Sequence, residues 1–255
     1  MKNKPLILIS NDDGFIAPGI RFLIEVLKPF AELLVVAPQS GRSGMSTAIT
    51  VKTPLDLIQV SEEPDLRIFR SNGTPVDCVK LALNILTLDR QPDLIVSGIN
   101  HGSNASVAIH YSGTMGAVLE GCMSGIPSIG FSLDNHMAEA NFKPCRPFIE
   151  SIVKSVLEHS LPKGVCLNVN FPDVETIKGL KICRQTRGRW VEEFDVRKHP
   201  RGGDYYWLMG AFRNDEPQSA DTDMYCMEQG YAAVVPSQID MTSYEMIETM
   251  KTWNL

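Results

Sequence analysis

The chain has no C-x-x-C pair and no long apolar run, although six cysteines are spread over its 255 residues. Structural zinc sites usually need paired cysteines, so we expect reduced core thiols in a cytoplasmic protein. A membrane-spanning helix needs about 20 apolar residues in a row, so no membrane partner is expected. The chain begins Met-Lys-Asn-Lys-Pro directly before an apolar run, which leaves no room for a separate signal peptide.

A basic block is also missing. Lys and Arg together number 24 against 30 Asp and Glu, which gives a formal net charge of -6. Proteins that bind nucleic acid without regard to sequence depend on clustered positive charge. Binding to a nucleic-acid duplex is therefore not expected as the main role.

Several catalytic signatures are absent as well. The chain has neither the Walker lysine nor the G-x-G-x-x-G dinucleotide fingerprint. Residues 11–13 read Asn-Asp-Asp, whereas phosphatases that form an aspartyl-phosphate need a D-x-D arrangement. Residues 41–45 read Gly-Arg-Ser-Gly-Met, so the second glycine of a G-x-S-x-G nucleophile elbow is missing.

What is present alternates between the patterns of buried strands and helices. Hydrophobic residues make up 44% of the chain and charged residues 21%, which is typical of a globular protein. The patterns predict strands at 6–9, 33–37, near 48–60, 66–70, 94–97 and 126–133, and helices at 18–30, from 72–75 onward, from 112–114 onward and at roughly 137–159. This order predicts an α/β fold with a parallel sheet and helices on both faces.

The second half of the chain breaks this alternation. Strands are expected at 165–171, 180–184 and 231–235, and a terminal helix at 243–250. Residues 185–223 are polar, except for a strand of half-buried aromatics at 205–208. We therefore predict one domain over residues 1–185 and a C-terminal extension over 186–255, with a hairpin that docks on a neighbouring subunit and a late strand that returns to the core.

Polar side chains follow three of the predicted parallel strands. They are Asp12 and Asp13, then Ser43 within Arg42-Ser43-Gly44, then Asn100 and Asn104. Ligands of open α/β sheets bind beyond the carboxyl ends of strands, so these oxygen atoms should converge. Two adjacent carboxylates repel each other unless a positive charge is near, and hard cations prefer such oxygens. An ordinary turn or helix cap is the alternative interpretation of Asn-Asp-Asp-Gly.

A fourth polar element lies at the start of a predicted helix, at Tyr111-Ser112-Gly113-Thr114. Exposed N–H groups and the helix dipole favour an anion there. A simple helix cap without a ligand is the alternative. A cation beside a phosphate-sized anion site is the arrangement used for phosphoryl hydrolysis.

These motifs resemble the SurE family, the stationary-phase survival proteins that act as 5'/3'-nucleotidases. The resemblance spans nearly the whole chain. The matching segments are residues 9–14, 36–38 with Arg42-Ser43, 72–75, 97–104, 111–114 with Glu120-Gly121, and the late 221–223 and 230–231.

The resemblance implies a Rossmann-like catalytic domain with an extension that is exchanged between subunits of a homodimer or homotetramer. It implies one divalent cation per subunit, Mg²⁺ or Mn²⁺, held by Asp12, Asp13, Ser43 and Asn100. Two departures from the family pattern are visible. The segment Ser106-Val107-Ala108-Ile109-His110 lacks the acidic residue that many members carry, and Gln39-Ser40-Gly41 is less charged than usual.

The predicted function is metal-dependent hydrolysis of nucleoside 5'- and 3'-monophosphates. Asp12 or Asp13 would handle the attacking water, and the sequence leaves that choice open. Asn104, Ser112, Gly113 and Thr114 would hold the phosphate. The alternative is a nucleotide-binding regulator that uses the same loop without turnover.

The histidines near this site carry little weight in the sequence. His101 and His110 lie close to the predicted ligands, but a lone histidine is more often structural or solvated. We therefore assign neither of them a catalytic role from the sequence.

Overall fold

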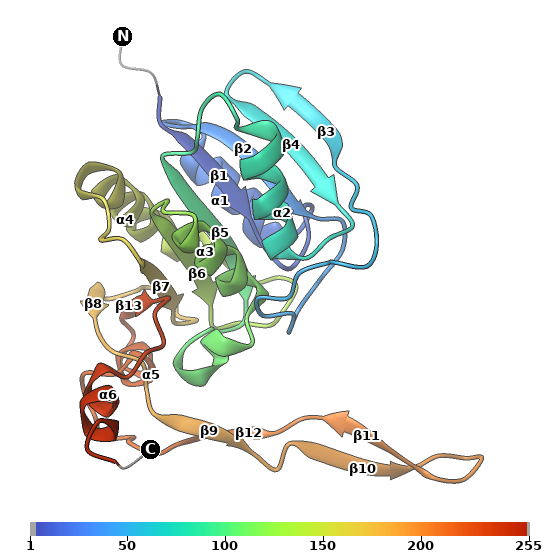
Figure 1. Cartoon of the computed structure of the whole chain (residues 1–255), viewed down its shortest axis with the longest axis vertical. Coiled ribbons are helices and arrows are strands. Elements are labelled where there is room, and N and C mark those ends of the chain that lie inside the picture. Colours follow the sequence, from blue (N-terminus) through green and yellow to red (C-terminus); the bar gives the residue numbers. More distant parts are fainter. Residues whose placement is uncertain (1–3, 254–255) are drawn as a thin grey trace.

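A central sheet organises the molecule. The structure is a computed structural model and describes residues 4–253. Within that range nine strands form one sheet in the order β3-β4-β2-β1-β5-β6-β7-β13-β8 (Figure 1). The strands are β1 Leu6–Ser10, β2 Glu32–Pro38, β3 Ile58–Glu63, β4 Leu66–Ser71, β5 Leu94–His101, β6 Ser128–Leu133, β7 Val165–Phe171, β8 Leu180–Ile182 and β13 Ala232–Gln238.

The sheet is parallel through its centre and mixed toward its ends. The strands from β4 through β2, β1, β5 and β6 to β7 pair in parallel. Strand β3 runs antiparallel to β4, and β13 runs antiparallel to β7. The predicted α/β class with a parallel sheet is confirmed, and antiparallel strands occur only toward the two ends of the sheet.

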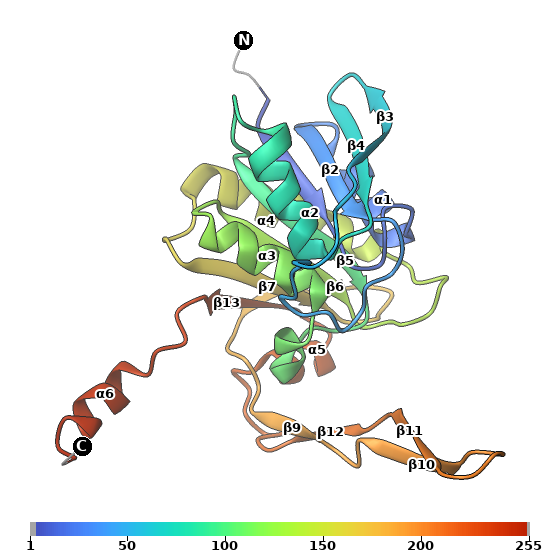
Figure 2. The same cartoon turned by 45° about the vertical axis from the view of Figure 1, so that its right-hand side comes forward.

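Helices cover both faces of the sheet, as Figures 1 and 2 show. Helices α1 (Pro18–Leu27) and α4 (Arg146–His159) pack on the face that carries Ile7 and Ile9. Helices α2 (Pro75–Leu81) and α3 (Gly113–Met123) lie on the other side, where α2 packs on the face that carries Leu6 and Leu8. Alternate residues of β1 thus face opposite helix layers, which explains its uninterrupted apolar sequence.

One glycine fixes how closely α1 crosses the sheet. A Cβ on Gly19 would lie 1.9 Å from the carbonyl oxygen of Ile99 in β5. No larger residue fits at that crossing. This close packing places the start of α1 beside the end of β5, next to the predicted ligand loops.

Short helical segments lie between the main elements. They are η1 (Ala82–Leu86), η2 (Ser106–His110) and η3 (Lys143–Cys145). The helix predicted at 137–159 begins only at Arg146, because Pro144 and Pro147 confine helical structure to their C-terminal side. The strand expected near 48–60 forms only at Ile58–Glu63, after Pro54.

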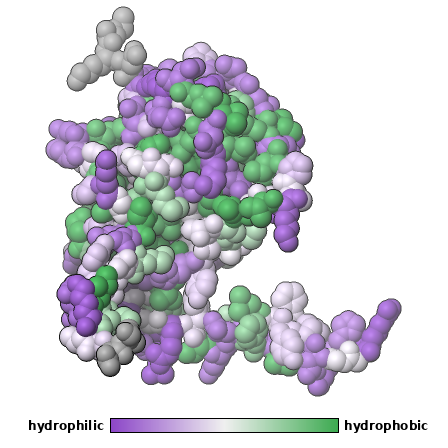
Figure 3. Space-filling model, in the orientation of Figure 1, coloured by the Kyte–Doolittle hydropathy of each residue, from purple (hydrophilic) through white to green (hydrophobic). Residues whose placement is uncertain are grey.

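A long arm leaves the body of the molecule between residues 188 and 214. It consists of two antiparallel ladders, β9 (Gly188–Val191) with β12 (Ala211–Asn214) and β10 (Phe194–Lys198) with β11 (Asp204–Leu208). The aromatics predicted to be half-buried are more exposed than expected, with Tyr206 62% accessible and Trp207 59%. Figure 3 shows hydrophobic side chains along this arm.

The chain returns to the body after the arm. Helix α5 (Asp223–Glu228) leads into β13, which lies between β7 and β8 in the sheet. Helix α6 (Tyr244–Met250) then extends from the body, and none of its residues is buried. Of the helices in residues 4–253, none combines the length and apolarity that crossing a bilayer requires.

Candidate active site

The three predicted ligand loops meet at one edge of the sheet. Strands β2, β1 and β5 are parallel neighbours, so their carboxyl ends lie together. Asp12, Ser43 and Asn100 line one cavity of about 560 Å³. The other lining residues are Gly44, His101, Gly102, Ser103, Asn104, Ala108, Tyr111, Ser112, His136, Trp190, Glu193, Leu208 and Met209.

Asp12 is the buried carboxylate of this cavity. It is only 3% exposed, and Thr114 Oγ1 donates a 2.5 Å hydrogen bond to its Oδ1. Burial raises the pKa of Asp12 from 3.8 to about 6; the Thr114 hydrogen bond opposes that rise, and the charge of Asp13 adds to it. The site therefore holds a carboxylate that is costly to ionise unless a cation approaches.

The start of α3 is built around Asp12. A Cβ on Gly113 would lie 2.8 Å from the Asp12 Cβ, so only glycine allows this approach. Thr114 is fully buried and its hydroxyl is used by Asp12. Neither Gly113 nor Thr114 lines the cavity, which places these two predicted phosphate-binding residues behind the carboxylate.

Asp13 is held by the last residue of β5. Its Oδ2 lies 3.3 Å from the backbone N–H of His101 and 3.3 Å from the ring atom Nδ1. Asp13 does not line the cavity, although His101 does. Sequence analysis assigned His101 no catalytic role, and the structure shows it as the neighbour that orients Asp13.

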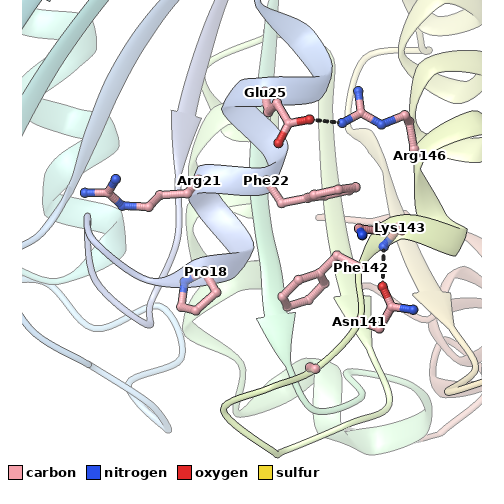
Figure 4. Close-up of a pocket in the computed structure, with 9 residues that line it drawn as sticks. Pro18, Arg21, Phe22, Glu25, Asn141, Phe142, Lys143 and Arg146 are labelled. Atoms are coloured by element: carbon pink, nitrogen blue, oxygen red, sulfur yellow. Dashed lines mark hydrogen bonds and ion pairs between the residues drawn. The ribbon is translucent and has the colours of Figure 1, made fainter.

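The His101 ring belongs to a cluster of three aromatic side chains. Its ring meets Phe142 edge-on at 5.1 Å between centroids, and Phe142 lies 6.0 Å from Phe22. Both phenyl rings line a second cavity between α1 and residues 140–146, shown in Figure 4. There Arg146 pairs with Glu25 and stacks over Phe22. This packing fixes the position of the His101 ring.

The two neutral ligands predicted for the cation are also held in place. Asn100 Nδ2 donates to the Gly102 carbonyl at 2.8 Å, which leaves its Oδ1 as the atom offered to the cavity. The loop that carries Ser43 is tied to the first loop, because the Arg42 N–H donates to the Asp12 carbonyl at 2.6 Å. The Arg42 guanidinium donates a hydrogen bond to the Asn72 carbonyl, and Arg42 does not line the cavity.

Buried amides position Asn104. Its backbone N–H donates to Asn170 Oδ1 at 2.8 Å, its carbonyl accepts from Asn168 Nδ2 at 2.9 Å, and its Nδ2 donates to Ser132 Oγ at 2.8 Å. The sequence reasoning missed Asn168 and Asn170. Two amides alternating within the apolar strand V-C-L-N-V-N-F were the signal that could have identified them.

Ser112 combines the two interpretations that the sequence left open. Its Oγ accepts from the Met115 N–H at 3.0 Å, so it caps α3. It also lines the cavity. A capping hydroxyl of this kind keeps its own proton, which remains available to a ligand oxygen.

The charge of the cavity favours a cation. Among the described residues, its lining includes Asp12 and Glu193 but no lysine or arginine. Residues 4–253 also contain no cluster of three or more His, Cys, Asp or Glu side chains able to hold a metal. A metal here would rely on Asp12, on Asp13 beside it, and on the neutral oxygens of Ser43 and Asn100. Such an all-oxygen donor set suits Mg²⁺ or Mn²⁺ rather than zinc.

Comparison with known proteins gives a consistent assignment. The family model of Survival protein SurE matches residues 7–192. The chain is 54% identical over 254 residues to the 5'-nucleotidase SurE of Phocaeicola vulgatus, covering 100% of this chain and 98% of the relative. It is 49% identical over 247 residues to that of Bacteroides thetaiotaomicron, covering 97% and 95%. The crystal structure of the SurE protein from Aquifex aeolicus superimposes with a TM-score of 0.83 at 35% identity, covering 97% and 98%. The chain therefore belongs to the SurE family.

Proposed function

We propose that this protein is a metal-dependent 5'-nucleotidase that also accepts nucleoside 3'-monophosphates. The observation that carries the proposal is the buried Asp12 carboxylate next to Asp13, in a cavity without a lysine or arginine. A phosphate dianion would be repelled from such a cavity unless a cation were present. The name 5'-nucleotidase, carried by relatives that match the full chain, supports the same activity.

The residues have distinct tasks in this proposal. Asp12, Asp13, Ser43 and Asn100 would hold one Mg²⁺ or Mn²⁺ ion. When bound, that ion neutralises phosphate oxygens and makes water more acidic. Asp12 faces the cavity whereas Asp13 is turned to His101, so we assign to Asp12 the contact with the attacking water.

Two further residues would bind the phosphate. The Ser112 hydroxyl keeps a proton after capping α3, and Asn104 keeps one amide N–H after bonding to Ser132. Both line the cavity. Gly113 and Thr114 would act indirectly, by holding Asp12 and the start of α3 in place.

The compartment is part of the same proposal. All six cysteines are free and buried, as expected of a protein in a reducing environment. We therefore propose a cytoplasmic enzyme.

Phosphate release from a panel of nucleoside 5'- and 3'-monophosphates tests the activity. We expect turnover with Mg²⁺ or Mn²⁺ and its loss with a chelator. Turnover that is unaffected by chelation would contradict the metal requirement. Nucleotide binding without any phosphate release would instead favour the non-catalytic regulator.

A further inference from the structure

Part of the lining of the active-site cavity comes from the arm. Trp190, Glu193, Leu208 and Met209 line it, and we refer to these four residues as the arm junction. They surround the point where the β9–β12 ladder passes into the β10–β11 ladder. Of the four, only Leu208 belongs to a segment that the sequence pattern distinguishes, the strand predicted at 205–208.

The arm junction has a defined backbone. The Met209 N–H donates to the Glu193 carbonyl at 2.8 Å. Glu192 and Gly210 both have positive φ, at 53° and 107°. Both residues lie between the two ladders, where the backbone departs from extended strand geometry.

The base of the arm is hydrogen-bonded to Ser106 at the start of η2. Buried Asp223 accepts hydrogen bonds from the Ser106 N–H at 2.8 Å and from the Thr186 hydroxyl at 2.5 Å. The Ser106 hydroxyl donates to the Thr186 carbonyl at 2.8 Å. All three residues are at least 98% buried. This cluster sets where the arm leaves the body relative to Asp12 and Asn100.

The arm junction leaves large apolar groups in water. Leu208 is 72% exposed, Met209 62% and Trp190 37%. The Trp190 ring packs edge-on against Phe212 at 5.8 Å, so it is held in position while it stays accessible. A ligand that covered these groups would remove apolar surface from water, which favours binding.

The cavity thus has two unlike walls. Asp12, Ser43 and Asn100 at the ends of the strands supply oxygens, and the arm junction, on a separate element, supplies a flat indole and aliphatic groups. A nucleoside monophosphate divides in the same way, into a charged phosphate and a flat base. A volume of about 560 Å³ lies within the range of sites for ligands of that size.

We propose that the arm junction is the nucleoside-binding subsite, with the base stacked on Trp190 and flanked by Leu208 and Met209. The Glu193 carboxylate accepts hydrogen bonds from N–H or O–H groups of the nucleoside and repels the phosphate, which would favour the end of the cavity where Asp12, Ser43 and Asn100 would hold the cation. This inference rests on the proposed nucleotidase function. It makes the arm a determinant of substrate choice, so phosphate esters with a base are preferred over those without one.

The test compares AMP with ribose 5-phosphate, which lacks the base, in wild type and in Trp190→Ala. Removing an aromatic partner of a base weakens binding by about 5-fold to 150-fold. We expect the KM for AMP to rise within that range while its kcat, and the kcat/KM for ribose 5-phosphate, change less than about twofold. Trp190→Phe should restore most of the affinity, because phenylalanine also stacks.

Trp207→Ala is the matched control. Trp207 lies on the same arm and is also exposed, but it does not line the cavity. We expect it to leave both substrates unchanged. An equal loss on both substrates in Trp190→Ala, or no loss on either, would overturn the proposal; the equal loss would mean that Trp190 acts through folding or assembly, which size-exclusion chromatography would show.

A binding measurement separates this inference from the proposed function. If wild type released no phosphate from either ester, the nucleotidase proposal would fail. Calorimetric titration with AMP would still test the subsite. Binding that is present in wild type and Trp207→Ala but lost in Trp190→Ala would support the inference, and binding that is equal in all three would refute it.

Discussion

Asp12 shows at the residue scale how a functional group opposes stability. The carboxylate is buried, its neighbour Asp13 is also acidic, and the cavity lining in the described part of the chain includes no lysine or arginine. Its pKa rises from 3.8 to about 6 on folding. That rise corresponds to roughly 3 kcal/mol of lost stability at most once the group is ionised.

We predict that Asp12→Asn abolishes turnover yet yields a protein at least as stable as wild type without metal. The pKa is raised in the folded state, so this contribution to stability is present below pH 3.8 and is lost as pH rises through about 6. Thermal unfolding in a chelator should therefore favour the variant at pH 8 and show a smaller difference at pH 5.

Manganese provides the control for that measurement. Added Mn²⁺ should raise the melting temperature of wild type at pH 8 and leave Asp12→Asn nearly unchanged, because binding to the native state alone stabilises it. Equal stabilisation of both proteins would place the metal elsewhere.

Helix α2 shows at the scale of an element how the sequence specifies a boundary. Thr74 and Asp77 form a capping box, in which each side chain bonds the backbone N–H of the other, at 3.1 Å and 2.9 Å. Asp77 also accepts from the Thr50 N–H at 3.0 Å, which ties the preceding loop to the helix. The sequence predicted this helix start at residues 72–75, because the pattern is local.

We predict that Asp77→Asn lowers stability by about 1–2 kcal/mol, since an amide cannot accept both hydrogen bonds. Burial raises the pKa of Asp77, but the hydrogen bonds from Thr50 and Thr74 outweigh it, and the net pKa is lowered from 3.8. The carboxylate therefore stabilises the fold above pH 3.8, and this contribution is lost as pH falls through the lowered pKa.

Denaturant unfolding between pH 2.5 and 7 checks this prediction. The loss of stability in acid should be smaller in Asp77→Asn than in wild type. Asp65→Asn is the matched control, because Asp65 only pairs with Lys4 at the surface. A control that lost as much stability as Asp77→Asn would contradict the role of the capping box.

At the scale of the whole molecule, α6 and the part of the arm outside the arm junction, which includes Val196 and Tyr206, present apolar groups that the chain itself does not cover. On α6 and its flanks these include Met241, Tyr244, Ile247, Met250 and Trp253, each at least 39% exposed. Gathered apolar surface of this kind is typical of an interface. The homodimer or homotetramer predicted from the sequence would cover it.

We predict a molecular mass in solution of two or four chains, and a lower mass for Ile247→Glu, because a charge buried in an apolar interface is unfavourable. Light scattering after size-exclusion chromatography measures both. Thr249→Glu is the control on the same helix, since it replaces a polar residue. A monomeric wild type, or an Ile247→Glu variant of unchanged mass, would contradict this use of α6.

The sequence by itself determined the parallel strands, most helices and the donor atoms at the strand ends. Those features depend on neighbouring residues: apolar runs form β1, β2 and β5, and parallel pairing then brings Asp12, Ser43 and Asn100 to one edge. The helix prediction was wrong at residues 137–145, because prolines there prevent the helix from starting before Arg146.

Only the tertiary structure decided how those donors are used. Thr114 bonds Asp12 across 102 positions of sequence, and Asn104 is held by Asn170 across 66. It also brought the arm junction to the cavity that Asp12 lines, with a hydrogen bond between Ser106 and Asp223, 117 positions apart, at the base of the arm. Such pairings leave no periodic signal in the chain, because they depend on how finished elements pack rather than on how each element forms.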